Sequence, residues 1–260
     1  MVSLSDYQTD TLQLLRDTNS LLTTPAQLLR WINLARNQTC LMTGCLEVLV
    51  AGNCPLGTSA VPGSLVVGGG IPGSKGVQLF QTIAGLEKYP YAYATPFIQA
   101  NNPGVKAAVE VKQVAISWGS YRPAMTWMPW QDMQAYYRAA SINVFNYPVA
   151  WSTTGDGIRG EVWLYPPPSV TGALSTSTFA QGEMEWLCSC IPLDLKTAND
   201  YEAIPEPYTN GVKFGAAMYA MLGAQRYGTA DLFRDMWADD LGLDRNSVDR
   251  GQPGNYYWGV

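Results

Sequence analysis

The residues of this chain best suited to acid–base chemistry are the acids between positions 183 and 206. Six acids stand there against a single base, Lys196. They are Glu183, Glu185, Asp194, Asp200, Glu202 and Glu206. Two carboxylates that face each other across a cleft could hydrolyse a glycosidic bond, but nothing in the spacing places two of these acids in that way. An exposed acidic surface is the more common outcome of such a charge run, so glycan hydrolysis is kept only as an alternative.

The chain contains no histidine, and this limits the reactions that it could catalyse. Without an imidazole there is no Ser-His-Asp or Cys-His nucleophile, and the usual catalytic zinc sites lose their main ligand. A pH switch based on histidine is excluded for the same reason. We therefore expect a protein that is not an enzyme and that carries no cofactor.

The cysteines are five in number, so any disulfide scheme leaves at least one of them unpaired. They are Cys40, Cys45, Cys54, Cys188 and Cys190. The N-terminal stretch is polar and does not resemble a secretory signal, so reduced thiols in a cytoplasmic setting are expected. A structural zinc held by Cys40, Cys45 and the Cys188–Cys190 pair is an alternative. That pair is spaced by one residue rather than the usual two, and we expect no metal.

Two other patterns have a functional interpretation. Residues 68–76 (GGGIPGSKG) are rich in glycine but lack the adjacent Gly-Lys-Ser/Thr of a phosphate-binding loop, so a flexible loop is expected there. The middle of the chain is rich in tryptophan, which could stack on sugars in a carbohydrate-binding module, although such residues more often belong to a core or an interface. These residues are Trp118, Trp127, Trp130, Trp151 and Trp163.

The composition is compatible with a protein that buries part of its surface in an assembly. Apolar residues make up 47% of the 260 residues and charged residues 14%, well below the roughly 25% of an average soluble domain. A large β-rich core would explain this as well as burial in an assembly does. The net charge of −5 argues against a grip on nucleic acid through counterion release, yet it suits a surface along which DNA slides without sticking.

The longest uncharged helical pattern lies near the C-terminus, at residues 214–225. Ala216, Ala220 and Ala224 recur at intervals of four and form one stripe of small residues, which would allow close helix packing. The pattern is too short to cross a membrane and predicts a buried helix. A second helix, capped by Thr229, is expected to follow. Its apolar side would consist of Leu232, Phe233, Met236, Trp237 and Leu241.

Two helices are also expected near the N-terminus. Ser5 begins a capping box for the first, which should run to about Asp17. The second has Thr24 as its cap, Pro25 at the first helical position and Gln27 closing the box. Its apolar stripe would consist of Leu28, Trp31, Ile32 and Ala35. The two helical pairs, far apart in sequence, are expected to combine into a four-helix bundle.

Between the helical pairs the pattern changes to short strands separated by turns. Strands are expected at residues 46–50, 77–83, 108–117, 121–128, 147–152, 158–165 and 176–191. A short helix is expected at 129–139. The fold class is therefore α+β: a helical bundle from residues 1–44 and 205–245, with an inserted antiparallel β domain over 45–204. Residues 52–76 of that domain form a Gly/Pro-rich loop.

Residues 246–260 are polar and rich in turn formers, but they end with three aromatics, Tyr256, Tyr257 and Trp258. An aromatic cluster at the end of such a tail calls for a partner surface. The tail could fold back on its own subunit. We favour docking on a neighbouring subunit or another protein, with the aromatics as anchors.

Several local patterns in this sequence occur in a recognisable order. They are Leu4-Ser5-Asp6 at a helix start, Leu29–Ala35, Pro129-Trp130 before Tyr147-Pro148-Val149, the Gly155-Asp156-Gly157 hairpin, Leu164–Pro168, and Ile204–Tyr208 at the entry to a helix over 212–225. Each pattern alone is weak, but together they cover most of the chain. In order and spacing the chain resembles the head-to-tail adaptor (neck or connector) proteins of short-tailed bacteriophages. The segment from Cys54 to Gly76 has no counterpart in that family.

The resemblance implies a non-enzymatic virion protein with a helical bundle and a β domain. Proteins of that family assemble in the host cytoplasm into a ring of twelve subunits in the neck of the particle. Such a ring binds the portal protein, receives the tail or nozzle protein, and lines the channel through which DNA leaves without specific binding. No membrane is involved. Tyr256, Tyr257 and Trp258 would then dock on the portal or on the next subunit. Another tail-tube or virion structural protein is the remaining alternative.

Overall fold

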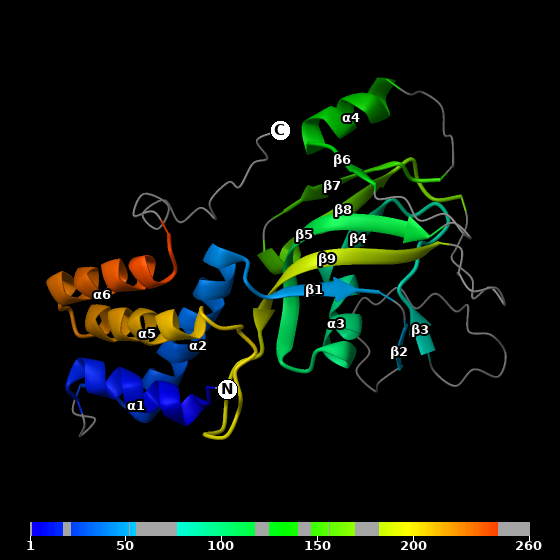
Figure 1. Cartoon of the computed structure of the whole chain (residues 1–260). Coiled ribbons are helices and arrows are strands. Elements are labelled where there is room, and N and C mark those ends of the chain that lie inside the picture. The colour runs from blue at the N-terminus through cyan, green and yellow to red at the C-terminus, as the bar shows by residue number, and fades with distance from the viewer. Residues whose placement is uncertain are drawn as a thin grey trace. The chain divides into compact units, whose positions relative to one another are not determined.

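The structure is a computed structural model of the whole chain, shown in Figure 1. It describes residues 2–17, 22–51, 53–55, 77–117, 125–139, 147–155, 157–169 and 182–243. The chain divides into a helical unit, formed by the segment up to Leu46 and the segment from Ile191 onward, and a β unit, Glu47–Cys190. The predicted α+β class is confirmed, because helices from both ends of the chain pack together and antiparallel sheets are inserted between them.

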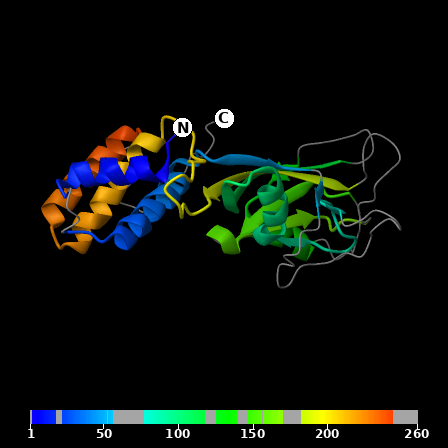
Figure 2. The same ribbon diagram turned by 90° about the horizontal axis from the view of Figure 1, so that it is seen from below.

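The helical unit is built around one central helix. Its helices are α1 (Leu4–Leu15), α2 (Pro25–Thr43), α5 (Thr209–Gly223) and α6 (Tyr227–Asp240). Helix α5 packs against the other three, and Figure 2 shows the group from a second direction. The sequence of α5 explains its place, since most of its residues are small or apolar and few of its positions carry a polar side chain. Val212, Ala216 and Ala217 are completely buried.

The N-terminal helices begin at well-formed caps. Thr24 caps α2, with Pro25 at its first position and Gln27 completing the capping box, as predicted. The cap of α1 is Ser3, not Ser5 as the sequence pattern predicts. Ser3 has an extended backbone and accepts the N–H of Asp6 at 3.3 Å, while the Asp6 carboxylate accepts the N–H of Ser3 at 2.9 Å. Asp6, in the third helical position, thus completes the capping box, whereas the pattern that starts at Ser5 would use Gln8 for this role.

The turn between α5 and α6 is tighter than the sequence predicts. Gln225 adopts a left-handed conformation with φ 59°, and Arg226 donates its N–H back to the Met221 carbonyl at 2.9 Å. The left-handed residue and this hydrogen bond together reverse the direction of the chain directly after α5, so α6 starts at Tyr227. Thr229, the predicted cap, therefore lies inside the helix, and the helix start has no side-chain cap.

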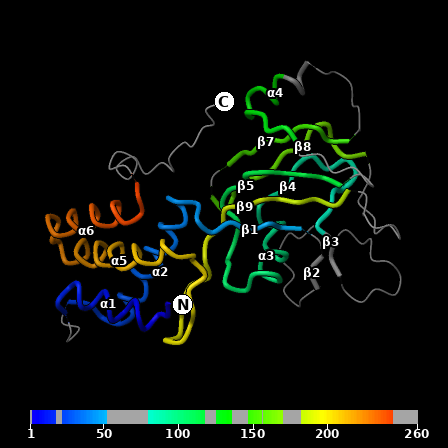
Figure 3. Tube along the Cα trace, in the orientation of Figure 1, coloured from blue at the N-terminus to red at the C-terminus, as the bar shows by residue number. Residues whose placement is uncertain are grey.

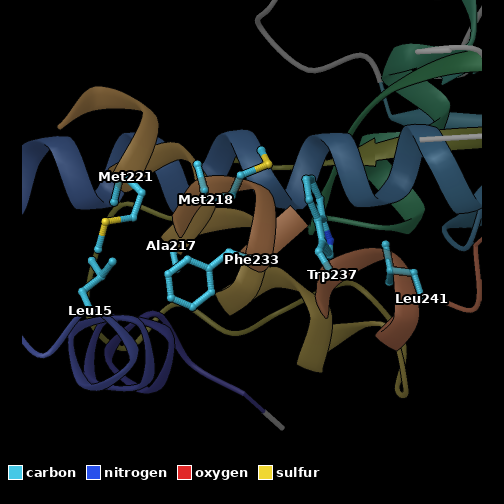
Figure 4. Packing of buried hydrophobic residues seen from close by; sticks show 9 residues of the cluster. Leu15, Ala217, Met218, Met221, Phe233, Trp237 and Leu241 are labelled. Atoms are coloured by element: carbon cyan, nitrogen blue, oxygen red, sulfur yellow. The ribbon is translucent and has the colours of Figure 1, made fainter. Parts of the chain in front are cut away.

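The core of the helical unit joins three helices, as Figure 4 shows. Its buried members are Leu15, Ala217, Met218, Ala220, Met221, Ala230, Phe233, Trp237 and Leu241. Trp237 of α6 reaches α2, where its Nε1 donates to Thr39 Oγ1 at 3.3 Å. The Trp237 ring lies directly against the backbone of α5: a Cβ placed on Gly215 would lie 2.9 Å from it. Glycine at position 215 thus sets the distance between α5 and α6.

The β unit contains three sheets in the described residues. The first has the order β1 (Glu47–Val50), β9 (Glu183–Pro192), β5 (Val105–Ser117); the second pairs β2 (Asn53–Pro55) with β3 (Val77–Leu79); the third has the order β4 (Lys88–Pro90), β8 (Glu161–Tyr165), β7 (Ala150–Thr154), β6 (Thr126–Trp127). Antiparallel pairing joins β1 to β9, β2 to β3, and β8 to both β4 and β7, whereas the short β6 pairs parallel with β7.

Strands β1 and β9 lie side by side, as the trace in Figure 3 shows, with Glu47 opposite Ser189. Glu47 is the first residue of the β unit and Ser189 is the last but one. The chain therefore enters and leaves the β unit at neighbouring points.

An aromatic cluster fills the interior of the β unit. Phe80 stands at its centre and contacts Tyr93, Phe97 and Trp186, with ring centroids 4.9 to 5.3 Å apart. Phe97 lies on α3 (Thr95–Asn101), a helix that the sequence does not predict. This helix has 7 residues, about two turns, and is too short to show a helical period. The predicted helix before β7 is present as α4 (Trp130–Ala139).

The end of the β unit differs from the predicted domain limit. Residues 191–204 belong to the helical unit rather than to the β domain. Asn33 of α2 explains this, because its side chain accepts the N–H of Leu195 at 2.9 Å and donates to the carbonyl of the same residue at 3.0 Å. Within the described residues, no helix has the length and apolar character required to cross a membrane.

Candidate interaction surface

Exposed apolar side chains of the helical unit include one pair on α2 and one pair on α6. On α2, Leu34 and Leu41 are 44% and 42% exposed, and their spacing of seven residues puts them on one face of the helix. On α6, Leu232 and Met236 are 58% and 37% exposed and lie one turn apart. We call these pairs the α2 patch (Leu34, Leu41) and the α6 patch (Leu232, Met236).

The α6 patch corrects the predicted apolar side of that helix. The sequence pattern groups Leu232 and Met236 with Phe233, Trp237 and Leu241 on the inner side. Phe233 and Trp237 are buried as predicted. A helix turns by roughly 100° per residue, so the residue just before each buried one projects away from the core, into solvent.

Charges of opposite sign flank the two patches. Arg30 is exposed on α2, one turn before Leu34. On α6, Asp235 and Asp239 stand beside Met236 and reach solvent. An apolar centre with complementary charges at its rim is the usual arrangement of a protein–protein contact.

A buried ion pair joins α2 to the segment that follows β9. Arg36 donates from Nε to Glu202 Oε2 at 2.6 Å and from Nη2 to Oε1 at 2.7 Å, and both side chains are 1% exposed. Nη1 of Arg36 donates to Asn33 Oδ1 and to the Leu193 carbonyl, each at 2.9 Å. Glu202 Oε1 also accepts the N–H groups of the next two residues, at 2.8 and 3.0 Å. Buried charges are stable only when paired and hydrogen-bonded in this way, so the network fixes this segment on α2.

The charge state of Glu202 follows from its surroundings. Burial raises the pKa of its carboxyl group, but the hydrogen bonds and the positive charge of Arg36 more than offset burial, so that the pKa lies below the ordinary value of 4.5. Burial and the negative charge of Glu202 raise the pKa of the Tyr7 phenol. Glu202 is therefore ionised and Tyr7 neutral at physiological pH.

Sequence reasoning missed the Arg36–Glu202 pair, although one signal for it exists. Arg36 comes four residues after Ile32 and one after Ala35, so it falls on the apolar stripe of its helix. An arginine on such a stripe requires a buried acid as its partner. The sequence does not identify Glu202 as that partner, because the two residues are far apart in the chain.

Two of the six acids considered for glycan hydrolysis have structural roles. Glu202 pairs with Arg36. Asp200 accepts hydrogen bonds from the Thr197 hydroxyl and from the N–H groups of Thr197 and Lys196, and these bonds lower its pKa to about 2. A catalytic general acid needs a pKa raised towards the working pH, so neither of these carboxylates suits that role.

The tryptophans considered for sugar stacking are partly engaged inside the β unit. Trp151 is 2% exposed and donates from Nε1 to a backbone carbonyl. Trp163 packs against Trp130, with ring centroids 4.3 Å apart. Trp127 is 45% exposed and presents an open ring, while Trp118 lies outside the described residues. The structure therefore brings no row of open rings together among the described tryptophans.

The thiols do not gather around a metal position in the described part of the chain. No group of three or more His, Cys, Asp and Glu side chains could hold a metal ion there. Cys188 and Cys190 are buried on β9, and each thiol lies within 4 Å of a carbonyl of its own strand. Cys40 and Cys45 form a separate pair, with their sulfur atoms 3.9 Å apart.

The alanine stripe of α5 is only partly a packing surface. Ala216 and Ala220 are buried, at 0% and 3% exposure, and Ala220 belongs to the hydrophobic core of the helical unit. Ala224 is exposed at the end of the helix, where it is the C-cap. The proposed docking aromatics Tyr256, Tyr257 and Trp258, like the rest of the tail over 246–260, lie outside the described residues.

Comparison of the chain with known protein families gives no match, and comparison with curated proteins gives none either.

Proposed function

We propose that this protein is a structural adaptor of a short-tailed bacteriophage. In this role it forms a ring in the neck of the virion, binds the portal protein, receives the tail or nozzle protein and lines the channel for DNA. It has no enzymatic activity and needs no cofactor. The ring assembles in the host cytoplasm and has twelve subunits, as in the family that the sequence resembles.

The observation that carries this proposal is the presence of two different apolar patches on one unit. A closed ring uses heterologous contacts, in which one surface of a subunit meets a different surface of the next. The α2 patch with Arg30 and the α6 patch with Asp235 and Asp239 are complementary in this sense. We assign the α2 patch of one subunit to the α6 patch of its neighbour.

The charge of the chain supports the same role. A net charge of −5 disfavours persistent contacts with phosphate groups. A channel for DNA needs this property, because a basic lining would hold the DNA that must pass through it.

The decisive experiment measures the mass of particles that the chain forms with the portal protein of its phage. The expected result is a closed ring on the portal, detected by native mass spectrometry. Leu34→Glu combined with Leu41→Glu should abolish the ring, because two buried charges would face the neighbour. Leu49→Glu is the matched control, since Leu49 is 59% exposed on the β unit and should leave the ring intact.

Circular dichroism of each variant alone distinguishes a lost contact from a lost fold. All three leucines are exposed, so the spectra should match that of the parent chain. Equal ring formation by the double variant and the parent would contradict the assigned contact. A ring that forms without any affinity for the portal would instead favour another tail-tube or virion structural protein.

The tail makes a separate prediction about the portal. Deleting residues 253–260 removes Tyr256, Tyr257 and Trp258 and should block attachment to the portal while the remaining chain stays folded. Normal portal binding by the truncated chain would exclude these aromatics as anchors.

Carbohydrate binding is the second candidate, and the exposed ring of Trp127 favours it. The measurement that tests it is titration of the full chain with oligosaccharides, comparing the parent with Trp127→Ala. Saturable binding by a monomer, lost in the variant, would support this candidate over the adaptor.

A further inference from the structure

The pair Cys40 and Cys45 stands at the point where the chain leaves α2. Cys40 lies in the last turn of the helix, and Gly44 ends it in a left-handed conformation with φ 61°, donating its N–H to the Cys40 carbonyl at 2.8 Å. This C-cap turns the chain back on itself. As a result Cys45 returns to the side of Cys40, and the two sulfur atoms lie 3.9 Å apart.

The separation of the two sulfur atoms is close to that of a bond. A disulfide has an S–S length of about 2.05 Å, so the sulfurs must approach by roughly 2 Å. Side-chain torsions at the two cysteines can supply this movement, because the helix end and the residue after its cap are already adjacent. The structure describes both thiols as free.

We propose that Cys40 and Cys45 are a reactive dithiol that a small disulfide such as glutathione disulfide converts into an intrachain disulfide. The two thiols differ in access: Cys40 is 1% exposed, whereas Cys45 is half-buried. Cys45 is therefore the residue that meets the oxidant, and Cys40 is the residue that resolves the intermediate.

The reaction proceeds by two thiol–disulfide exchanges. The Cys45 thiolate attacks one sulfur of glutathione disulfide, the S–S bond of the oxidant breaks, and one glutathione leaves and takes up a proton. Cys40 then loses its proton and attacks the Cys45 sulfur, which releases the second glutathione. Two protein thiols are oxidised, and one glutathione disulfide is reduced to two glutathione molecules.

Hydrogen bonding supports this division of roles. The hydrogen bond between the two sulfur atoms lowers the pKa of Cys45, while the same contact, together with burial, raises the pKa of Cys40. The attacking group in thiol exchange is the thiolate. Cys45 therefore reacts first, and Cys40 keeps its proton until the mixed disulfide has formed.

The new bond would link the last turn of α2 to the residue after its C-cap, Gly44, and so restrain the conformation of this C-cap. It acts at the connection from the helical unit into β1, since the β unit begins at Glu47. A protein made in a reducing compartment and later exposed to an oxidising one would acquire this bond after it has folded. The bond does not depend on the adaptor role.

The test treats the reduced full-length chain with glutathione disulfide and counts free thiols after denaturation. The expected result is the loss of two of the five thiols, without any bound glutathione. Chymotrypsin cuts at Leu41 and Met42, between the two cysteines, so mass spectrometry should then find two peptides joined through Cys40 and Cys45. Cys54→Ser is the matched control and should lose two thiols in the same way.

Two single variants test the order of the steps. Cys40→Ser should stop at the mixed disulfide and carry one glutathione on Cys45. Cys45→Ser should remain unmodified at the buried Cys40. A parent chain that keeps all its thiols, that retains glutathione on Cys45, or that joins Cys45 to Cys54 would overturn the proposal.

Discussion

Arg36 shows how much one residue can determine in this protein. It satisfies a buried carboxylate, an asparagine and a backbone carbonyl at once, and it connects the N-terminal half of the helical unit to the segment that returns from the β unit. Removal of either charge leaves the other one buried without a partner. Such a change costs far more than the ion pair itself contributes.

Glu202→Gln is therefore expected to lower the free energy of unfolding by about 3–5 kcal/mol. Urea titration followed by circular dichroism measures this change. The matched control is Glu47→Gln, which removes the partner of Lys112 at a site where the two side chains are 47% and 33% exposed. Exposed pairs contribute less than about 1 kcal/mol. Equal losses in the two variants would contradict a structural role for the buried pair.

Glu202 also predicts how stability depends on pH. Its pKa is lower in the folded chain than in the unfolded chain, so the unfolded state binds more protons below the ordinary value of 4.5. The contribution of Glu202 is thus complete above that value and is lost as the pH falls through the folded pKa. Asp200 and Asp6, whose pKa values are also lowered by hydrogen bonds, act in the same direction.

Unfolding titrations between pH 7 and pH 3 measure this dependence. The parent chain should lose stability steadily below about pH 4.5. In Glu202→Gln the loss over the same range should be smaller, because one titrating group is gone. A parallel pH dependence in parent and variant would assign the acid sensitivity to other carboxylates.

At the scale of elements, glycine rather than alanine sets the closest approach between helices. A Cβ on Gly215 would lie 2.9 Å from the Trp237 ring and 3.0 Å from the Ala35 Cβ, so both α6 and α2 would have to shift. A Cβ on Gly228, near the start of α6, would meet nothing within 4 Å. The same substitution, glycine to alanine, can therefore be made once at a tightly packed position and once at an open one.

Gly215→Ala should destabilise the chain by about 1–3 kcal/mol through overpacking. Gly228→Ala should stabilise it by up to about 1 kcal/mol, because alanine has the better helix propensity. Thermal unfolding of the two variants gives the sign directly. A stabilised Gly215→Ala would mean that α5 and α6 are not in close contact.

The sequence predicts the elements of this fold better than their relations. Apolar periodicity and capping residues locate α2 and α5, because both signals are local. Local signals also mislead: Ser5 and Thr229 look like caps, but the Ser3–Asp6 bonds and the left-handed Gln225 move the helix starts. The α3 helix is too short to be periodic. The α6 patch could not be predicted, because the sequence does not show which of two adjacent apolar residues, such as Leu232 and Phe233, is buried. Packing of α6 against α5 determines this.

At the scale of the whole molecule, each unit has its own core. The helical unit closes around α5, and the β unit closes around Phe80. Because Glu47 lies opposite Ser189, removal of the β unit leaves two chain ends that a short glycine linker can join. The helical unit should then form without its insertion.

A chain in which such a linker replaces residues 47–190 is expected to be helical and cooperative in thermal unfolding. The excised fragment 47–190 should show a β-type spectrum and a near-ultraviolet signal from Trp186 in its aromatic core. Circular dichroism of both pieces measures this. A helical unit that fails to unfold cooperatively would mean that it depends on the β unit for its stability.

The insertion between α2 and α5 also has a consequence for synthesis on the ribosome. Helices α1 and α2 emerge first, but α5, which covers them, emerges only after the whole β unit. At about 5–20 residues per second, translation of that insertion takes on the order of ten seconds. During this interval the β unit can fold, whereas α2 can contact α1 but lacks α5, against which it packs in the finished chain. The inserted β unit can therefore fold before the helical unit, because the helical unit needs α5 from the C-terminal part of the chain.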